Sequence, residues 1–505
     1  MRNARFSCTS LTKQAIVCIS LFAASGLTLS EETETPPWDV SAPSYSAEVQ
    51  EIDLNVTEGT WMNLDVSPDG QHIAFDLLGD IYHIPITGGE ATPLLSGHAW
   101  EVQPQYSPDG RFLAFTSDRN GADNIWVMDL ANPDNKHQIT HESFRLLNNP
   151  SWHPSGDYLV AKKHFTTSRS LGTGEVWLYD ANVDQALARG NLQGSVLVKR
   201  PSPAFQKELG EPTFSADGGS VFYIQNMTPG NTFIYHEDSN GEVMAIKRYD
   251  LETGEIEKVV GGAGGAVRPT PSPDGKTLAF VKRVRAASRL FVMDLASGEQ
   301  TMLVDDLDPD MQETWAVQGA YPTMAWTPDG KSIVYWSQGH IWRVDVGSGE
   351  TRQIPFSVND TRTAYPAVEV AVDVAPDTLT TAMPRFATQS PDGQSVIFES
   401  MGRLYVKRSD TEAKRLTRDT TDAVEFSPAF SPDGKDVYYL TWSDDALGSV
   451  RKVSARGGRP QNVLATPGHY VDLSVSSDGE TLLFAKLSGS ALTNPHWGNK
   501  PGIYT

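Results

Sequence analysis

Basic side chains are sparse in this sequence, and they gather at two places where they could bind an anion. The 505 residues include 41 Lys and Arg against 63 Asp and Glu, a net charge of −22. The two clusters are Lys162, Lys163, His164 and Arg169, and Lys282 and Arg283 with Arg285 and Arg289. Both follow equivalent turns of a repeated motif, and loops on one face of a repeat protein often form its binding surface. They could therefore hold an anionic group such as the carboxylate terminus of a peptide. Ordinary charge on strand edges, which discourages strand addition, is the alternative.

The sequence contains no complete catalytic motif. A barrel-type metal-dependent hydrolase site begins with His-x-His and a serine hydrolase needs Gly-x-Ser-x-Gly, and neither pattern occurs. His137 and His141 flank a predicted strand and do not share a helix face, so we interpret them as surface residues. We therefore expect no catalytic residue, no metal ligand and no cofactor in this chain, and no hydrolase activity from residues 31–505.

One acidic stretch resembles a cation site only in part. It contains Asp305, Asp306, Asp308, Asp310 and Glu313. Alternating carboxylates can hold calcium, but Met311 stands where an EF-hand loop needs glycine, and Val317 where it needs a bidentate glutamate. We interpret the stretch as a solvated loop.

Residues 1–30 have the order of a secretory signal peptide. Arg2, Arg5 and Lys13 precede an apolar stretch from Ala15 to Ala24, and small residues follow it. This stretch is too short to span a bilayer, and no later segment approaches about 18 uninterrupted apolar residues. We therefore expect a periplasmic or secreted protein without a membrane span, with residues 31–47 as a linker. A buried N-terminal helix is the alternative.

Charge and cysteine content exclude two further classes. The acidic balance argues against nucleic acid as a partner, because phosphate binding needs a broad basic surface. The two cysteines, Cys8 and Cys18, both lie in the expected signal peptide, so no disulfide framework is expected.

A turn motif recurs along the rest of the chain. Ser67-Pro68-Asp69-Gly70 precedes an apolar run, and Ser107-Pro108-Asp109-Gly110 does the same. Nine copies end at Gly70, Gly110, Gly156, Gly218, Gly275, Gly330, Gly393, Gly434 and Gly479. Pro presets the first corner of a tight turn, Asp accepts a backbone N–H, and Gly takes the positive φ that reverses the chain. Each copy therefore predicts a β-hairpin.

Two more strands follow each hairpin, with no helical periodicity between them. Asn124-Ile125-Trp126-Val127 is one third strand, and Gln138-Ile139-Thr140 is a fourth. The strand that leaves each corner, such as Leu113-Ala114-Phe115, is apolar on both faces, as in stacked sheets. The fold class is therefore all-β, with four-stranded antiparallel blades of a β-propeller; a β-sandwich is the alternative.

Nine blades exceed one ring, so we expect a six-bladed propeller followed by part of a second. The predicted parts are a propeller over 48–356, a connecting segment over 357–387 and further blades, incomplete, over 388–505. Gly502 to Thr505 matches only the start of a third strand. Either the strand Glu48 to Val56 completes that last blade, or the chain is the front part of a longer polypeptide.

The repeats resemble those of TolB-like propellers, bacterial periplasmic modules. The resemblance rests on the Ser-Pro-Asp-Gly copies with Thr116 to Gly121 and Asn124 to Asp129. Longer stretches, among them Phe144 to Asp180 and Gly264 to Phe280, resemble the N-terminal propeller of a family of exported amidohydrolases. That resemblance implies a non-catalytic scaffold or substrate-gating region. The metal-dependent hydrolase barrel, with its divalent metal, would lie beyond Thr505.

Two other functions stay open at this point. The chain could be a stand-alone periplasmic interaction module with a protein or peptide-like ligand, or the propeller of an exported serine peptidase. Fold alone does not decide among them, since propellers support many functions.

Overall fold

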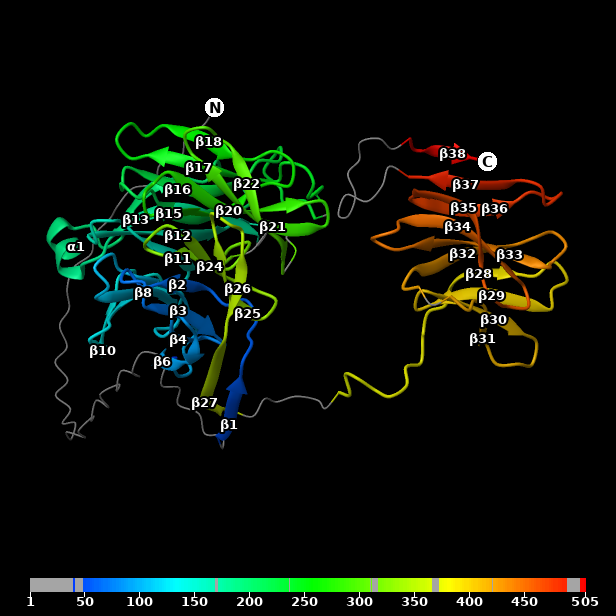
Figure 1. Ribbon diagram of the computed structural model, residues 1–505, viewed down its shortest axis with the longest axis horizontal. Helices are drawn as coiled ribbons and strands as arrows, with labels where there is room; N and C mark the ends of the chain where they lie inside the picture. The colour runs from blue at the N-terminus through cyan, green and yellow to red at the C-terminus, as the bar shows by residue number, and fades with distance from the viewer. Residues whose placement is uncertain are drawn as a thin grey trace, which may run out of the picture. The chain divides into compact units, whose positions relative to one another are not determined.

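The computed structural model describes residues 40, 49–168, 171–235, 237–308, 310, 317–365, 372–419, 421–487 and 500–505. The expected signal peptide and nearly all of the expected linker lie outside these ranges. The regular secondary structure of the described chain is almost entirely strand (Figure 1), with one short helix, α1 (Val183–Arg189).

The predicted all-β fold of repeated four-stranded sheets is confirmed. Each of the first six sheets takes its strands from one continuous stretch of sequence. They are β2 (Leu64–Val66), β3 (His72–Leu77), β4 (Asp80–Pro85) and β6 (Thr92–Leu95); β7 (Glu101–Tyr106), β8 (Phe112–Ser117), β9 (Asn124–Asp129) and β10 (Asn132–Gln138); and β11 (Leu147–Trp152), β12 (Tyr158–Thr166), β13 (Gly172–Asp180) and β14 (Ser195–Val198). The next three are β15 (Leu209–Phe214), β16 (Ser220–Asn226), β17 (Met244–Asp250) and β18 (Ile256–Val260); β19 (Val267–Pro271), β20 (Thr277–Val284), β21 (Ala287–Asp294) and β22 (Gln300–Leu307); and β23 (Ala325–Trp326), β24 (Ser332–Ser337), β25 (His340–Asp345) and β26 (Thr351–Ile354).

The corner motif forms the hairpins as its chemistry predicts. In the first sheet the Ser67 hydroxyl donates to Asp69 Oδ1 (2.6 Å) and accepts the His72 N–H (2.9 Å). Asp69 Oδ1 also accepts the Gln71 N–H (2.9 Å), and Gly70 has φ +70°. All nine corner glycines have φ between +67° and +79°, a region that favours glycine.

Apolar packing joins each of the six sheets to the next and the sixth back to the first. Phe115 of β8 and Ala279 of β20 are fully buried between sheets. At the closing seam, Val334 and Trp336 of β24 pack with Leu64 and Phe75 of the first sheet. A Cβ added at the Gly70 corner would lie 3.3 Å from Pro328 of the sixth corner, so the corners also meet across this seam. The ring of six blades is therefore closed.

A two-stranded ribbon ties the start of the ring to its end. β1 (Gln50–Val56) pairs antiparallel with β27 (Phe356–Ala364), from Gln50 opposite Ala364 to Val56 opposite Val358. β27 also pairs, in parallel, with the short β5 (Gly89–Glu90). The prediction that Glu48 to Val56 could complete the last blade is wrong, because β1 pairs with β27 and not with a strand of the last sheet. Ser357 to Ala364, predicted to be connecting chain, is strand.

Three further sheets follow. They are β28 (Arg385–Gln389), β29 (Ser395–Ser400), β30 (Arg403–Arg408) and β31 (Lys414–Arg415); β32 (Val424–Phe430), β33 (Asp436–Trp442), β34 (Gly448–Ser454) and β35 (Gln461–Gly468); and β36 (Tyr470–Val475), β37 (Leu482–Lys486) and β38 (Gly502–Tyr504). Leu404 packs with Tyr439 at one interface, and Leu440 with Phe484 at the other. The last sheet has three strands among the described residues.

Candidate binding site

In each of the six blades a polar residue lies four positions before the corner, within the first strand or just before it. These residues, here called the inner tier, are Asn63, Gln103, Asn149, Glu211, Arg268 and Thr323. In four blades the residue precedes a proline, has φ between +49° and +59°, and sits where the strand pairing shifts register. Proline has no N–H for the ladder, so the strand bulges at this point, and a bulge re-aims the side chain.

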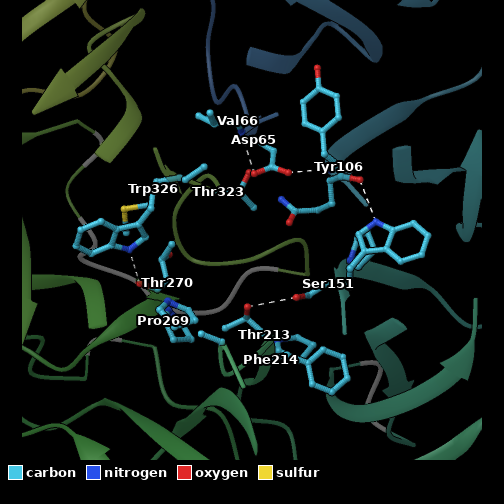
Figure 2. Close-up of a pocket in the computed structure, with 18 of the residues that line it drawn as sticks. Asp65, Val66, Tyr106, Ser151, Thr213, Phe214, Pro269, Thr270, Thr323 and Trp326 are labelled. Atoms are coloured by element: carbon cyan, nitrogen blue, oxygen red, sulfur yellow. Dashed lines mark hydrogen bonds between the residues drawn. The ribbon is translucent and has the colours of Figure 1, made fainter. Parts of the chain in front are cut away.

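A second ring of side chains lies two positions before each corner. This outer tier is Asp65, Gln105, Ser151, Thr213, Thr270 and Ala325. Together with most of the inner tier it lines a cavity of about 450 Å³, here called the channel pocket. Figure 2 shows Asp65, Ser151, Thr213 and Thr270, from four different blades, around this space. Both tiers are mostly neutral hydrogen-bonding groups, so the pocket suits a polar ligand.

Aromatic rings and corner prolines form the mouth of the channel pocket. The rings are Tyr106, Trp152, Phe214 and Trp326, and the prolines include Pro68, Pro108, Pro154 and Pro273. The Trp152 indole N–H donates to the Gln105 carbonyl (3.1 Å), and that of Trp326 donates to the Thr270 carbonyl (2.9 Å). These bonds fix both indoles to the neighbouring blade and leave apolar surface at the entrance.

The inner tier is one buried hydrogen-bonded layer. Gln103 Nε2 donates to Asn149 Oδ1 (3.2 Å), and Arg268 Nη1 donates to the same oxygen (3.1 Å). Glu211 accepts the Arg268 backbone N–H (2.6 Å) and forms an ion pair with its guanidinium (3.3 Å). These four side chains are at most 5% exposed, so the layer fills the channel beneath the pocket.

Residues 317–321, which lead into the sixth blade, cross the channel and are held by four other blades through their backbone. Lys162 Nζ donates to the Val317 carbonyl (2.8 Å), and Gln103 Nε2 donates to the Gln318 carbonyl (2.7 Å). The Ala320 N–H donates to Glu211 Oε1 (2.6 Å), and Arg268 donates to the Tyr321 carbonyl. The channel pocket therefore has a closed base.

Burial shifts the ionisation of the acids around the pocket. The pKa of Asp65 is raised to about 7 by burial, although it accepts two backbone N–H groups. Burial likewise raises the pKa of Asp76, on β3, to about 7; this carboxylate accepts the Gln103 N–H (2.8 Å) and two N–H donors of Asn63. The pKa of the Arg268 guanidinium is lowered by burial, with Glu211 opposing the shift.

The first predicted basic cluster lies on β12, the second strand of the third blade. Lys162 is fully buried and pairs with Glu208 (2.5 Å). Lys163 pairs with Glu142, and its ammonium lies 4.3 Å from the centre of the Trp177 ring. His164 is buried, and burial lowers its pKa to about 4. Arg169 lies outside the described residues.

The second cluster lies in the fifth blade, which is not adjacent to the third: Lys282 and Arg283 are on β20, Arg285 is in the turn that follows, and Arg289 is on β21. Arg283 is buried and binds Asp310 (2.7 Å) and the Ser239 hydroxyl (2.7 Å). Asp310 of the acidic stretch is thus an ion-pair partner, and not only a solvated carboxylate. Lys282 is half-buried, and burial lowers its pKa. Several of these cations already have carboxylate partners, and the anion site predicted for them stays a prediction.

The described residues contain no group of three or more His, Cys, Asp and Glu side chains placed to hold a metal ion. His137 and His141 are exposed. No helix in the described part of the chain is long and apolar enough to cross a bilayer.

Comparison with known proteins agrees with the β-propeller fold described above. The family described as the TolB beta propeller domain matches residues 50–195. This chain contains a TolB-like β-propeller. A TolB structure from Acinetobacter baumannii is 16% identical, with a TM-score of 0.43 over 60% of this chain and 66% of that one.

The curated relatives are longer than this chain. An uncharacterized peptidase of Bacillus subtilis, YuxL, is 26% identical over 47% of this chain and 30% of its own length. Tricorn protease homolog 1 of Streptomyces coelicolor is 24% identical over 84% of this chain and 37% of its own length. The chain thus spans about a third of the length of these relatives.

Proposed function

We propose that the six-bladed ring is the non-catalytic, peptide-binding part of an exported hydrolase of the peptidase kind. The observation that carries the proposal is the channel pocket: an outer tier of mostly polar side chains, a base closed by the buried inner tier and residues 317–321, and aromatic rings at the mouth. Asn and Gln side chains offer both a donor and an acceptor and so match peptide groups, and aromatic rims hold apolar side chains.

The names of the relatives also favour a hydrolase of the peptidase kind. YuxL is described as a peptidase, and the Streptomyces relative as a tricorn protease homolog. A dipeptidyl aminopeptidase of Pseudoxanthomonas mexicana is 24% identical over 45% of this chain. All three names belong to peptidases, so we favour the peptidase alternative over the amidohydrolase one. Because the pocket has a closed base, the ring would capture a peptide from one side and would not let it pass through.

Binding of labelled octapeptides of mixed sequence to the full chain, followed by fluorescence anisotropy, tests this proposal. Thr270→Arg places a long side chain in the pocket and should weaken binding at least tenfold. Thr388→Arg is the matched control, because Thr388 holds the same place, two residues before the corner, in the sheet of β28–β31. Saturable binding that Thr270→Arg abolishes and Thr388→Arg preserves supports the proposal. No binding, or equal binding by all three proteins, overturns it.

A further inference from the structure

The charges inside the channel pocket do not balance. Among its lining residues the charged ones are Asp65, Glu211 and Arg268. Arg268 is engaged by Glu211, Asn149 and the Tyr321 carbonyl, all in the buried base. Among the described residues, no cation forms an ion pair with Asp65. Asp76 adds a further carboxylate at the level of the inner tier, where it accepts the Gln103 N–H.

Asp65 is placed to receive a ligand. It stands in the outer tier, and its side chain is partly exposed to the pocket. Oδ1 accepts the Val66 N–H (2.9 Å) and Oδ2 accepts the Tyr106 N–H (2.7 Å), which fixes the carboxylate in one orientation. Each carboxylate oxygen can accept a second hydrogen bond, so both retain capacity for a donor from the pocket.

We infer that the channel pocket takes an aliphatic ammonium group of a peptide, bound at Asp65. This inference rests on the proposed peptide-binding function and names the group that the pocket recognises. An ammonium has three N–H donors, and the outer tier supplies neutral oxygens around the same space, from Gln105, Ser151, Thr213 and Thr270. The ligand group is the α-amino terminus or a lysine side chain, which share this chemistry.

If an ammonium group binds at Asp65, its affinity should depend on pH. Charged and titratable groups around Asp65 are Tyr106 on β7, Asp69 at its own corner, Asp76 on β3, and Glu211 and Arg268 in the base. Since the pKa of Asp65 is about 7, the carboxylate becomes charged as pH rises through neutrality, and Asp76 charges over the same range. Affinity for a cation should therefore rise from pH 5.5 to 7.5.

Three octapeptides of otherwise identical sequence distinguish an α-amino terminus from a lysine side chain as the bound ammonium group. One has a free amino terminus and no lysine, one is acetylated without lysine, and one is acetylated with lysine. With the wild-type chain at pH 7.5, acetylation should weaken binding at least about tenfold, as loss of a hydrogen bond to a charged group implies. If the α-amine is the ligand, affinity falls again above about pH 8, where that amine loses its proton. If lysine is the ligand, the acetylated lysine peptide binds and keeps its affinity to higher pH.

Asp65→Asn should abolish the advantage of the free-amine peptide over the acetylated lysine-free peptide. Asp129→Asn is the control, since Asp129 also accepts a local backbone N–H (2.9 Å) but lies outside the pocket. Equal affinity for all three peptides, blocked by Thr270→Arg, overturns the ammonium assignment and leaves peptide binding intact. The acetylation and pH series use the wild-type chain, so they decide the question even if Asp65→Asn does not fold.

Discussion

Gly319 lies against Arg268 so closely that a Cβ added to the glycine would overlap the guanidinium nitrogen. The backbone at Gly319 has φ +112°, which also favours glycine. The contact lets the chain cross the channel at the level of the inner tier, where its peptide groups form hydrogen bonds with the inner-tier side chains. The close packing at the base of the pocket therefore requires glycine at position 319.

Gly319→Ala should lower the melting temperature of the full chain by several degrees more than Gly349→Ala. Both glycines have positive φ, but a Cβ at Gly349, in the β25–β26 turn, meets nothing within 4 Å. The control therefore measures backbone strain of about 1 kcal/mol, and the difference measures overlap in a packed layer, about 1–3 kcal/mol. Equal losses in thermal unfolding would contradict the proposed close packing.

The amide of Ala320 should exchange slowly with solvent although it belongs to no strand. Its N–H is bound to Glu211 in the buried layer, and exchange requires that layer to open. Gly347, an exposed residue in the turn before β26 whose N–H donates only to the surface carboxylate of Asp345, provides the comparison. Hydrogen exchange measured by mass spectrometry with peptides covering both positions should show Ala320 protected; exchange of both at the same rate would show that the base is open in solution.

Arg362→Ala should destabilise the ring more at pH 8 than at pH 5. Arg362 of β27 forms an ion pair with Asp80 of β4 (2.8 Å), and burial raises the pKa of Asp80 to about 7 despite this cation. A raised folded-state pKa means that stability falls as pH rises from about 4 to 7, because charging the buried acid is unfavourable. Removing the arginine increases that penalty only where Asp80 is charged.

Melting temperatures at the two pH values measure this difference. Arg352→Ala, on exposed β26, should have the same small effect at both. Equal losses for Arg362→Ala at pH 5 and pH 8 would mean that Asp80 is charged at both and would contradict the raised pKa.

Ser107→Ala should lower stability by about 1 kcal/mol at pH 7 and by less at pH 3. The Ser107 hydroxyl bonds Asp109 and the Phe112 N–H, and the bond to Ser107 is the main cause of the lowered pKa of Asp109. A lowered folded-state pKa contributes stability above the unfolded value, and that contribution is lost as pH falls below about 4. Urea unfolding at the two pH values measures the change; a larger loss in acid would mean that Asp109 is not involved.

Local chemistry accounts for what the sequence predicts correctly. The Ser67–Asp69–Gly70 corner is determined by residues within five positions of one another, so nine hairpins and their strands could be recognised without any knowledge of packing. The inner tier was missed, although its signal was present: Gln103, Asn149, Glu211 and Arg268 each lie four residues before the first residue of a corner and directly before a proline. The sequence does not show that these prolines form bulges facing one channel.

Pairings between distant segments could not be predicted. β1 and β27 are about 300 residues apart and meet because the ring closes between them, a property of all six blades together. Lys162 and Arg283 stood out as rare cations, but the carboxylates that bind them, Glu208 and Asp310, become neighbours only on folding. In this acidic chain, these two basic residues proved to be members of buried or partly buried ion pairs.

The register of β1 with β27 also determines how the ring bears mechanical load. Gln50 is paired with Ala364, so the segments entering and leaving the ring depart from the same end of the ribbon. Tension between the polypeptide before Gln50 and that after Ala364 would act on one residue pair at a time and peel the ribbon open from this end. The ribbon should therefore yield at low force, while the packed blades behind it stay assembled.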